Sequence, residues 1–269
     1  MIIKKLLKIG ITGASGRMGR TLIKLACSDS DVELRLALEF SESKFLGNDA
    51  GENFGTKTGT IITSNIEGIK NCDVIIDFTR PSGSLKYLQE CVSHNVPAVI
   101  GTTGFTAQEM KSIKSSAEKI PVVYAPNMSI GVNVLLRLVE LAAKTLGRKF
   151  DTEILEAHHR EKEDAPSGTA LKIGEVVAKS LGKDLRSDGV FSRYGFGEKR
   201  KNGSIGFATI RGGDVVGDHT AIFAGDGERI EISHKASDRS TFARGAMRAA
   251  KYVTSMPPGL YDMNSVLGR

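Results

Sequence analysis

Short runs of apolar residues alternate with amphipathic segments over the first half of the chain. The apolar runs lie at residues 8–12, 33–40, 61–64, 73–79, 97–103 and 121–127. Segments with helical spacing follow the first run and recur at residues 84–95 and 106–119. Thr106 and Glu109 have the spacing of a capping box and mark the start of the last of these helices. Strands that alternate with helices pair in parallel through crossover connections, so this half predicts an α/β, doubly wound Rossmann-type sheet.

The pattern changes after residue 127. An amphipathic helix is expected at residues 131–146, and we expect its buried stripe to comprise Val134, Leu135, Leu138, Leu141 and Ala142. An alternating strand, a helix and three strand-like runs then follow, at residues 151–158, 169–181, 205–212, 219–225 and 228–234. Consecutive strands without intervening helices predict a second, α+β domain whose sheet is partly antiparallel.

A last helix is expected at about residues 240–254, where small apolar residues are frequent. We expect this helix to return to the first domain. The predicted boundaries are therefore residues 1–129 completed by 240–269 for the first domain, and residues 130–239 for the second.

Composition and charge set limits on the class of protein. The chain has 269 residues, of which 40% are hydrophobic and 25% charged, as in ordinary soluble globular proteins. It contains no apolar run of eighteen residues and no signal-peptide cleavage pattern, so we expect no membrane partner and a cytoplasmic location. Three widely spaced cysteines, Cys27, Cys72 and Cys91, favour buried reduced thiols over disulfides or a zinc site.

The net charge of +6 admits either nucleic acid or anionic small molecules as partners. The densest basic cluster, residues 198–202, lies among glycines and has no accompanying aromatic platform. We interpret this cluster as a solvated, mobile loop and expect no nucleic-acid partner.

A glycine-rich turn joins the first strand to the first helix. Its sequence, GASGRMG at residues 13–19, permits a tight turn and close approach of a pyrophosphate to the helix N-terminus. Glu39 ends the second strand twenty residues after Gly19, where a carboxylate accepts the ribose hydroxyls of an adenosine. This combination predicts a dinucleotide site.

The residue after Glu39 bears on the choice of cofactor. Phe40 offers no positive charge for a 2′-phosphate, which favours NADH over NADPH, while Arg17 in the glycine turn leaves NADPH open. The nicotinamide is expected at the carboxyl ends of the later parallel strands, near residues 78–79, 101–103 and 125–127.

The segment EAHHREKEDAPSGT, residues 156–169, combines proton-transfer groups with an anion-binding turn. His158 or His159 and Lys162 can exchange protons, and the turn after Pro166 presents backbone N–H groups at a helix start. Successive strand residues face opposite sides, so both histidines face one site only if the strand ends between them. The spacing favours neither zinc nor a serine hydrolase, because H-E-x-x-H and G-x-S-x-G are absent. These residues indicate a reductase whose substrate bears carboxylates, with no metal.

Several motifs together resemble the 4-hydroxy-tetrahydrodipicolinate reductase family, also called dihydrodipicolinate reductase, of lysine and diaminopimelate biosynthesis. They are GASGRMG, ALEF, DFTRPSG, VIGTTGF, PNMSIGVNV, EAHHREKEDAPSGTA, IGFATIRGGDVVGDHTAIF and HKASDRSTFA. The resemblance runs nearly end to end. It implies the NAD(P)H-dependent reduction of 4-hydroxy-tetrahydrodipicolinate, a cyclic dicarboxylate, to tetrahydrodipicolinate with loss of water.

The resemblance also implies roles for particular residues. His158 matches the acid/base residue, Lys162 the proton donor, and His159, Gly168 and Thr169 the substrate contacts. The positions that match the cofactor lining are Gly13, Ala14, Ser15, Gly16, Arg17, Met18, Glu39, Phe40, Gly101, Thr102, Thr103, Ala125, Pro126, Asn127 and Met128. Phe40 departs from members that carry arginine, and Met128 stands where an aromatic residue is common. The family further implies a homotetramer formed through the sheet of the second domain.

Two other functions remain open from the residues alone. A non-catalytic dinucleotide sensor that binds nucleic acid would explain the glycine turn and the net charge, but would leave the histidine segment without a role. A dehydrogenase acting on another small carboxylate would use the same groups.

Overall fold

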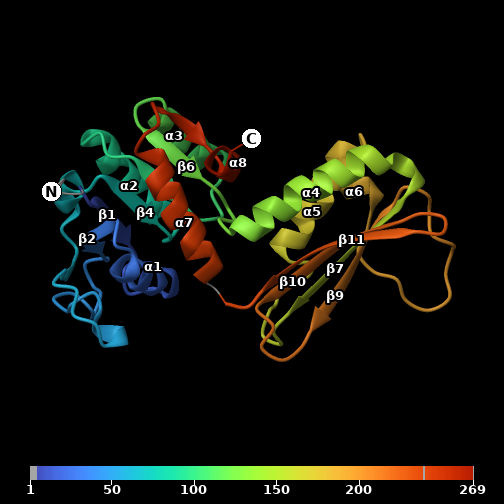
Figure 1. Cartoon of the computed structure of the whole chain (residues 1–269), viewed down its shortest axis with the longest axis horizontal. Helices are drawn as coiled ribbons and strands as arrows, with labels where there is room; N and C mark the ends of the chain where they lie inside the picture. Colours follow the sequence, from blue (N-terminus) through green and yellow to red (C-terminus); the bar gives the residue numbers. More distant parts are fainter. Residues whose placement is uncertain (1–4, 239, 269) are drawn as a thin grey trace. The chain divides into compact units, whose positions relative to one another are not determined.

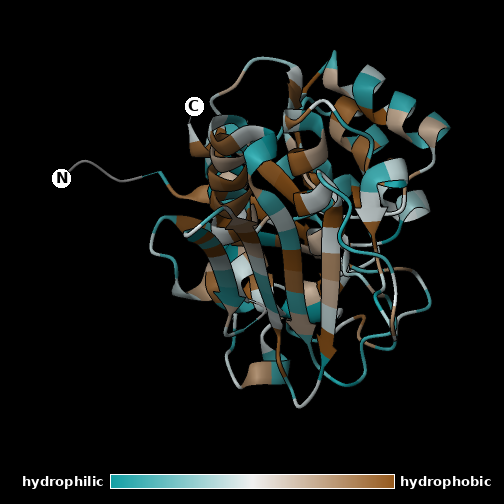
Figure 2. Ribbon diagram, turned by 90° about the vertical axis from the view of Figure 1, so that its right-hand side faces the viewer, coloured by the Kyte–Doolittle hydropathy of each residue, from teal (hydrophilic) through white to brown (hydrophobic). Residues whose placement is uncertain are grey.

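The computed structural model describes residues 5–238 and 240–268 and divides into two compact units (Figure 1). Unit 1 comprises Met1–Ile130 and Ser240–Arg269, and unit 2 comprises Gly131–Arg239. Hydrophobic and hydrophilic residues alternate in bands along the strands and helices (Figure 2). Within the described part of the chain, no helix is long and apolar enough to cross a membrane.

Unit 1 is built on a seven-stranded sheet in which every pairing is parallel. The strands, in spatial order, are β12 (Gly259–Tyr261), β6 (Pro121–Tyr124), β5 (Ala98–Ile100), β4 (Val74–Asp77), β1 (Leu7–Thr12), β2 (Val32–Leu38) and β3 (Ile62–Thr63). The order changes direction at β1, as in dinucleotide-binding sheets. The predicted Rossmann-type sheet is therefore confirmed, with β12 as an edge strand that the sequence did not indicate.

Helices cover both faces of this sheet. They are α1 (Arg17–Ser28), α2 (Pro81–Ser93), α3 (Ala107–Ala117), α7 (Ser240–Val253) and the short α8 (Met263–Leu267), with 3-10 turns η1 (Glu52–Phe54) and η2 (Ile66–Asn71). Along β4, Val74 and Ile76 pack in a core with α1 and α7, whereas Ile75 packs in a core with α2 and α3. Both faces are thus buried, which explains the continuous apolar runs of these strands. The capping box of Thr106 and Glu109 is confirmed.

Unit 2 contains a five-stranded mixed sheet. Its strands, in spatial order, are β11 (Arg229–Ala236), β10 (Gly217–Ala224), β7 (Asp151–His158), β9 (Ile205–Arg211) and β8 (Gly189–Val190). β10 is antiparallel to both β11 and β7, whereas β9 is parallel to β7 and β8. The helical elements of this half are α4 (Ile130–Leu146), η3 (Gly147–Lys149), α5 (Gly168–Ser180) and α6 (Leu185–Asp188). Residues of α4 and α5 share one core with β7, β9 and β10.

The predicted buried stripe of α4 is wrong in part. Leu135 is buried, but Val134, Leu138 and Leu141 are 42%, 46% and 64% exposed. The buried face is instead formed by Val132, Leu135, Val139 and Ala143. Because α4 carries apolar residues on more than one side, periodicity alone does not choose its buried face.

Two smaller expectations also need correction. Cys72 and Cys91 are buried free thiols as expected, but Cys27 is exposed. The basic loop is not simply solvated, because Arg200 donates hydrogen bonds to the carboxylates of Asp151 and Glu153 and to backbone carbonyls of the sheet. Arg200 therefore fastens this loop to the start of β7 and to the residue that precedes β9.

Candidate active site

The glycine turn of unit 1 has the geometry of an anion-binding cradle. Gly13 has a φ of 64°, which favours glycine, and its carbonyl accepts a hydrogen bond from the N–H of Gly16. A Cβ at Gly19 would lie 2.1 Å from the Gly13 carbonyl oxygen, so this position requires glycine. Among the described residues, no side chain caps α1 and its first turn contains no acid. The N–H groups at the start of α1 are therefore suited to an anion.

Glu39 lies beside this turn and is only 6% exposed. Its Oε1 accepts hydrogen bonds from the Ser15 N–H and hydroxyl at 2.9 and 2.7 Å, and its Oε2 accepts one from the Phe40 N–H at 3.3 Å. Because a carboxylate oxygen accepts about two hydrogen bonds, Oε2 retains acceptor capacity. The Phe40 side chain is 59% exposed.

The other residues predicted in this turn divide between the interior and the surface. Ala14 is buried and Met18 is partly buried against the core, whereas Arg17 is exposed. Gly16 is also exposed. The structure thus brings the turn and Glu39 together, with Arg17 pointing to solvent.

The next strand ends meet around Asp77, which was not among the predicted site residues. Asp77 is 3% exposed, and its carboxylate accepts hydrogen bonds from the hydroxyls of Thr12, Thr79, Ser84 and Thr102. These hydroxyls come from the ends of β1, β4 and β5 and from α2. Asp77 therefore ties three strand ends together.

The residues predicted at the end of β5 lie around this junction. Thr102 directs its hydroxyl inward to Asp77, and Thr103 is exposed. A Cβ at Gly101 would lie 2.1 Å from the ring of Phe78, so glycine allows this ring to pack. The Thr102 hydroxyl thus belongs to the junction around Asp77.

The segment after β6 contains the last predicted cofactor residues. Ala125 and Met128 are buried, whereas Pro126 is exposed. The Asn127 side chain accepts a hydrogen bond from the Ser129 N–H at 2.9 Å. A Cβ at Gly245 would lie 1.7 Å from the carbonyl oxygen of Met128, so α7 packs directly on this segment. Met128 is part of the core of unit 1.

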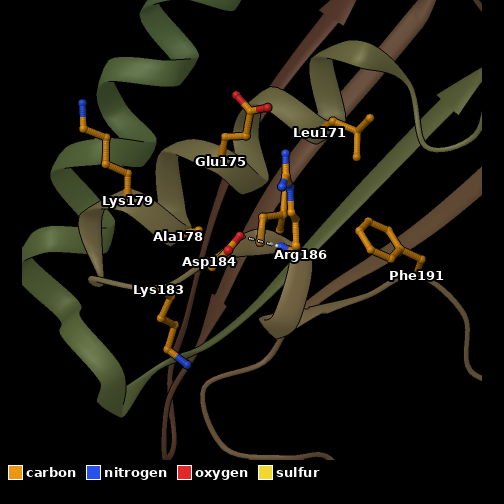
Figure 3. Close-up of a pocket in the computed structure, with 9 residues that line it drawn as sticks. Leu171, Glu175, Ala178, Lys179, Lys183, Asp184, Arg186 and Phe191 are labelled. Carbon is orange, nitrogen blue, oxygen red and sulfur yellow. Dashed lines mark hydrogen bonds between the residues drawn. The ribbon is translucent and has the colours of Figure 1, made fainter.

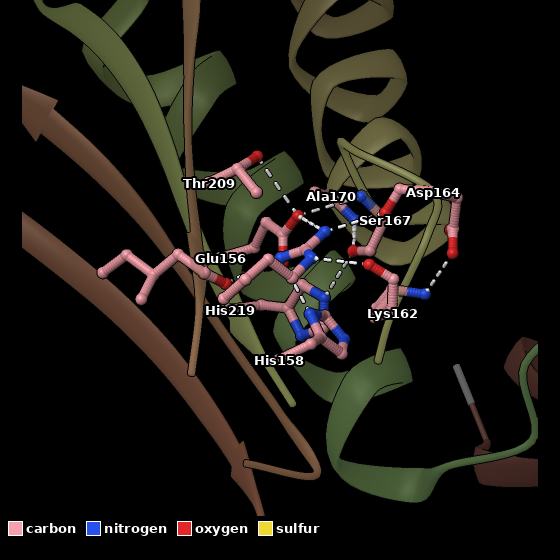
Figure 4. A network of polar contacts seen from close by, with 10 residues as sticks. Glu156, His158, Lys162, Asp164, Ser167, Ala170, Thr209 and His219 are labelled. Atoms are coloured by element: carbon pink, nitrogen blue, oxygen red, sulfur yellow. Dashed lines mark hydrogen bonds and ion pairs between the residues drawn. The ribbon is translucent and has the colours of Figure 1, made fainter. Parts of the chain in front are cut away.

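In unit 2, the histidine segment begins on β7 and surrounds a buried carboxylate (Figure 4). Glu156 is 1% exposed, and the Nδ1 of His158 lies 2.5 Å from its Oε2. The hydroxyl of Thr209 and the N–H of Ser167 also donate to Glu156. This arrangement resembles the carboxylate–imidazole pairs that orient catalytic histidines, because the bond at Nδ1 leaves Nε2 for other chemistry.

Arg211 completes the contacts of Glu156. Its Nη1 and Nη2 donate to the two carboxylate oxygens at 2.9 and 2.8 Å. Burial alone would raise the pKa of Glu156, but hydrogen bonds from Arg211 and His158 outweigh burial and hold this pKa below its usual range. Burial lowers the pKa of His158, opposed by the bond to Glu156. Glu156 is therefore a charged partner for a mostly neutral imidazole at pH 7.

A second buried histidine lies against the first. The rings of His158 and His219 meet edge to face with centroids 5.0 Å apart, and the Nε2 of His219 lies 2.8 Å from the Ser167 hydroxyl. Ser167 also caps α5 by accepting a hydrogen bond from the Ala170 N–H. His219 thus couples the N-terminus of α5 to the imidazole of His158.

The remaining residues predicted for the substrate lie nearby or on the surface. Lys162 is 20% exposed in its side chain, and its Nζ pairs with Asp164 at 2.7 Å. Gly168 is exposed, and a Cβ there would meet no atom within 4 Å, while Thr169 is half-buried in the first turn of α5. Lys162, Gly168 and Thr169 therefore sit in one segment with free space at the helix start.

His159 lies apart from the buried network. β7 ends at His158, and His159 lines an open hollow of about 620 Å³ together with Arg160, Glu161, Gly213 and Asp214. The strand thus ends between the two histidines, which was the condition for both to serve one site. Of the two histidines, His158 is the one that the described structure shows bonded to Glu156.

Another hollow of unit 2, of about 820 Å³, has no such arrangement (Figure 3). It is lined by Leu171, Glu175, Ala178, Lys179, Lys183, Asp184, Leu185, Arg186 and Phe191. Its basic and acidic side chains are mixed, and none of the predicted site residues lines it. We therefore place the candidate site at the histidine segment.

The comparisons with known proteins cover both halves of the chain. The family described as "Dihydrodipicolinate reductase, N-terminus" matches residues 7–128, and "Dihydrodipicolinate reductase, C-terminus" matches residues 131–267. A protein of Nitrosospira multiformis named 4-hydroxy-tetrahydrodipicolinate reductase is 53% identical over 97% of this chain and 98% of its own length. One of the same name from Burkholderia lata is 51% identical over 97% and 99%.

Solved structures show a similar fold. A dipicolinate-bound dihydrodipicolinate reductase from Paenisporosarcina sp. TG-14 matches with a TM-score of 0.77 at 24% identity, over 97% of this chain and 99% of that one. An amine dehydrogenase from Mycobacterium smegmatis matches with a TM-score of 0.59 at 10% identity, over 96% and 95%. Because both family regions match and the named relatives are half identical over nearly their full length, the chain belongs to the dihydrodipicolinate reductase family.

Proposed function

We propose that this protein reduces 4-hydroxy-tetrahydrodipicolinate to tetrahydrodipicolinate with loss of water, using NADH or NADPH, in lysine and diaminopimelate biosynthesis. Family membership supports the reaction. The observation that carries the residue assignment is the meeting of the buried His158–Glu156 pair, Lys162 and the N-terminus of α5 in one segment. This segment offers positive charge and proton donors to a small dicarboxylate. A cytoplasmic location fits such a biosynthetic step.

The residues of unit 1 fit a dinucleotide. The start of α1 offers N–H groups to a pyrophosphate, and the Oε2 of Glu39 has capacity for a ribose hydroxyl. The lining we propose is the glycine turn, Glu39, Phe40 and the segments at residues 101–103 and 125–128. When bound, the reduced nicotinamide supplies the hydride.

The preference between NADH and NADPH follows from the negative charge of Glu39 and the uncharged side chain of Phe40 beside it. A 2′-phosphate placed near the Glu39 carboxylate would be repelled, and Phe40 supplies no compensating cation. We therefore propose that NADH is preferred and NADPH is accepted with the help of Arg17. The preference rests on Glu39 staying in the position that Ser15 holds.

The groups of unit 2 act on the substrate. The backbone N–H groups of Gly168 and Thr169 bind one carboxylate at the start of α5. Lys162 stabilises the anionic ring and donates a proton to it, and His158 serves as the acid/base residue through Nε2. His159, which lies in a separate hollow, is proposed to contact the substrate from the end of β7.

A homotetramer formed through the sheet of unit 2 completes the proposal. The face of this sheet opposite α4 and α5 carries apolar residues, among which Ile210 is 52% exposed and Ala208 is exposed. Leu155 and Ile222 share this face and are half-buried. Such a face is typical of an interface between subunits. Equilibrium sedimentation tests the mass, and a monomer at assay concentrations would contradict this assembly.

Turnover with enzymatically generated substrate tests the reaction, followed by nicotinamide absorbance with NADH and NADPH in parallel. Oxidation of neither cofactor would refute the function. A substrate panel separates this activity from a dehydrogenase for another carboxylate. Lys162→Ala should reduce turnover far more than it weakens NADH binding. Equal losses in both would remove Lys162 from the chemistry.

A further inference from the structure

Arg211 uses its whole guanidinium group on the segment that carries the proposed proton-transfer residues. A guanidinium has five N–H groups in a rigid planar fork. Nη1 donates to Glu156 and to the Ile210 carbonyl, and Nη2 donates to Glu156 and to the Asp164 carbonyl. Nε donates to the Lys162 carbonyl at 3.3 Å. All five N–H groups therefore have an acceptor.

These acceptors belong to two different parts of the site. Glu156 lies on β7 and holds the Nδ1 of His158 at 2.5 Å. The carbonyls of Lys162 and Asp164 belong to the loop that follows β7, and the side chains of the same two residues form an ion pair. Arg211 thus binds both the Glu156 carboxylate, which contacts the His158 imidazole, and the backbone of Lys162 and Asp164, which carries the Lys162 ammonium group.

The register of the sheet places Arg211 where it can make these contacts. β9 is parallel to β7, and Arg211 is the neighbour of His158 in this pairing. The Arg211 side chain is 19% exposed, whereas the carboxylate that it binds is 1% exposed. An arginine that forms a bidentate bond with a buried carboxylate has little freedom to move.

We propose that Arg211 is a positioning residue for the reduction, which sets the relative placement of the His158 imidazole and the Lys162 ammonium group. The inference rests on the proposed function, because it assigns both groups to the reaction. Arg211 acts through Glu156 and through the loop, and is not expected to touch the substrate. A displacement of about 1 Å between reacting groups costs on the order of 100-fold in rate.

The test compares Arg211→Lys with Arg211→Met. Lysine keeps the charge but has three donors on a single nitrogen, so it cannot reproduce the fork. We expect kcat to fall on the order of 100-fold in Arg211→Lys, while the KM for NADH changes by less than about twofold. A purely structural role would reduce the fraction of protein with a folded unit 2, which urea unfolding followed by circular dichroism measures, without reducing kcat per folded molecule.

The pH profile gives a second measurement. The charged or titratable groups that face His158 are Glu156, Lys162, Arg211 and His219. Loss of the Arg211 charge removes a repulsion from protonated His158, so the His158 limb of kcat/KM should move to higher pH in Arg211→Met. It should move less in Arg211→Lys, which keeps a positive charge.

Arg193 supplies a matched control. It also forms a bidentate pair with a glutamate of β7, donating to Glu153 at 2.7 and 2.8 Å, and within the described residues these bonds lie outside the histidine segment. Arg193→Lys should leave kcat and the pH profile unchanged. If neither Arg211 variant folds, Glu156→Gln, which keeps the shape of the side chain, should show the same loss of kcat.

The outcomes separate the two proposals. A wild-type protein without turnover would refute the proposed function. If the wild type is active and Arg211→Lys retains the wild-type kcat, the role of Arg211 is overturned. Where Glu156→Gln replaces the Arg211 variants, an unchanged kcat in Glu156→Gln has the same consequence. An equal loss in Arg193→Lys would also overturn it, because the effect would then belong to any ion pair of this sheet.

Discussion

Acidification from pH 7.5 to pH 5 should destabilise unit 2 through His219. This histidine is 4% exposed, and burial lowers its pKa from 6.5 to about 4, with a further contribution from His158 when that ring is protonated. The geometry gives the same direction. The Nδ1 of His219 is buried without a hydrogen-bond partner among the described residues, so the protonated ring would carry an Nδ1–H that has no acceptor there.

The sign and the size follow from proton linkage. Between pH 6.5 and pH 4, the unfolded chain binds a proton at this histidine and the folded chain does not, so the stability that is complete above pH 6.5 is lost as the pH falls. Two and a half pKa units correspond to about 3 kcal/mol in total, of which about 2 kcal/mol is lost by pH 5. Burial also lowers the pKa of His158 and His234, which adds to the loss in the wild type.

Urea unfolding at pH 7.5 and pH 5 measures this effect as a difference in the free energy of unfolding. His219→Gln retains a partner for the Ser167 hydroxyl but does not titrate, so its stability should fall by about 2 kcal/mol less than that of the wild type over this interval. His94→Gln is the control, since His94 is the exposed C-cap residue of α2 and pairs with Glu90. Equal pH dependence in the wild type and His219→Gln would refute the reasoning.

Three further predictions concern unit 1. Gly19→Ala places a Cβ against the Gly13 carbonyl and should lower the free energy of unfolding by about 1–3 kcal/mol and weaken NADH binding; unchanged urea unfolding would contradict the packing. Asp77→Asn replaces a carboxylate that accepts four hydroxyl bonds with an amide that also donates two, and should cost about 1–3 kcal/mol per unsatisfied group in the same assay. Ser15→Ala frees Glu39 from one hydrogen bond of about 1 kcal/mol, so kcat/KM for NADPH relative to NADH should rise about fivefold; an unchanged ratio would exclude this role.

The strength of the sequence prediction depended on how strictly each element follows its periodicity. β7 was predicted at its observed bounds because buried and half-buried positions alternate along all eight residues. β12 was missed because three residues beginning with glycine carry too little pattern. For α4, the apolar residues lie on more than one side, so the helix was predicted but its buried face was not. Periodicity therefore predicts where a helix or strand lies along the chain better than it predicts which face of that element is buried.

The candidate site was predictable where its residues are contiguous and unpredictable where strand pairing assembles it. His158, Lys162 and Gly168 lie in one short segment, so proton transfer and anion binding could be predicted from the sequence. Arg211 lies 55 residues beyond the glutamate that it binds, and only the parallel pairing of β9 with β7 brings the two together. Asp77 was overlooked for the same reason, since its four hydroxyl partners come from separate strand ends and from α2.

The two glutamates of β7 show what decides the partner of a buried charge. Glu153 and Glu156 are three residues apart and therefore face opposite sides of the sheet. Glu153 pairs with Arg193 and Arg200 from the loop after β8, whereas Glu156 faces the core side, where its burial is tolerable only with several donors. Strand parity predicts that Glu156 shares a side with His158, two residues later. Parity does not identify the arginine that neutralises it, because that choice belongs to the register between strands.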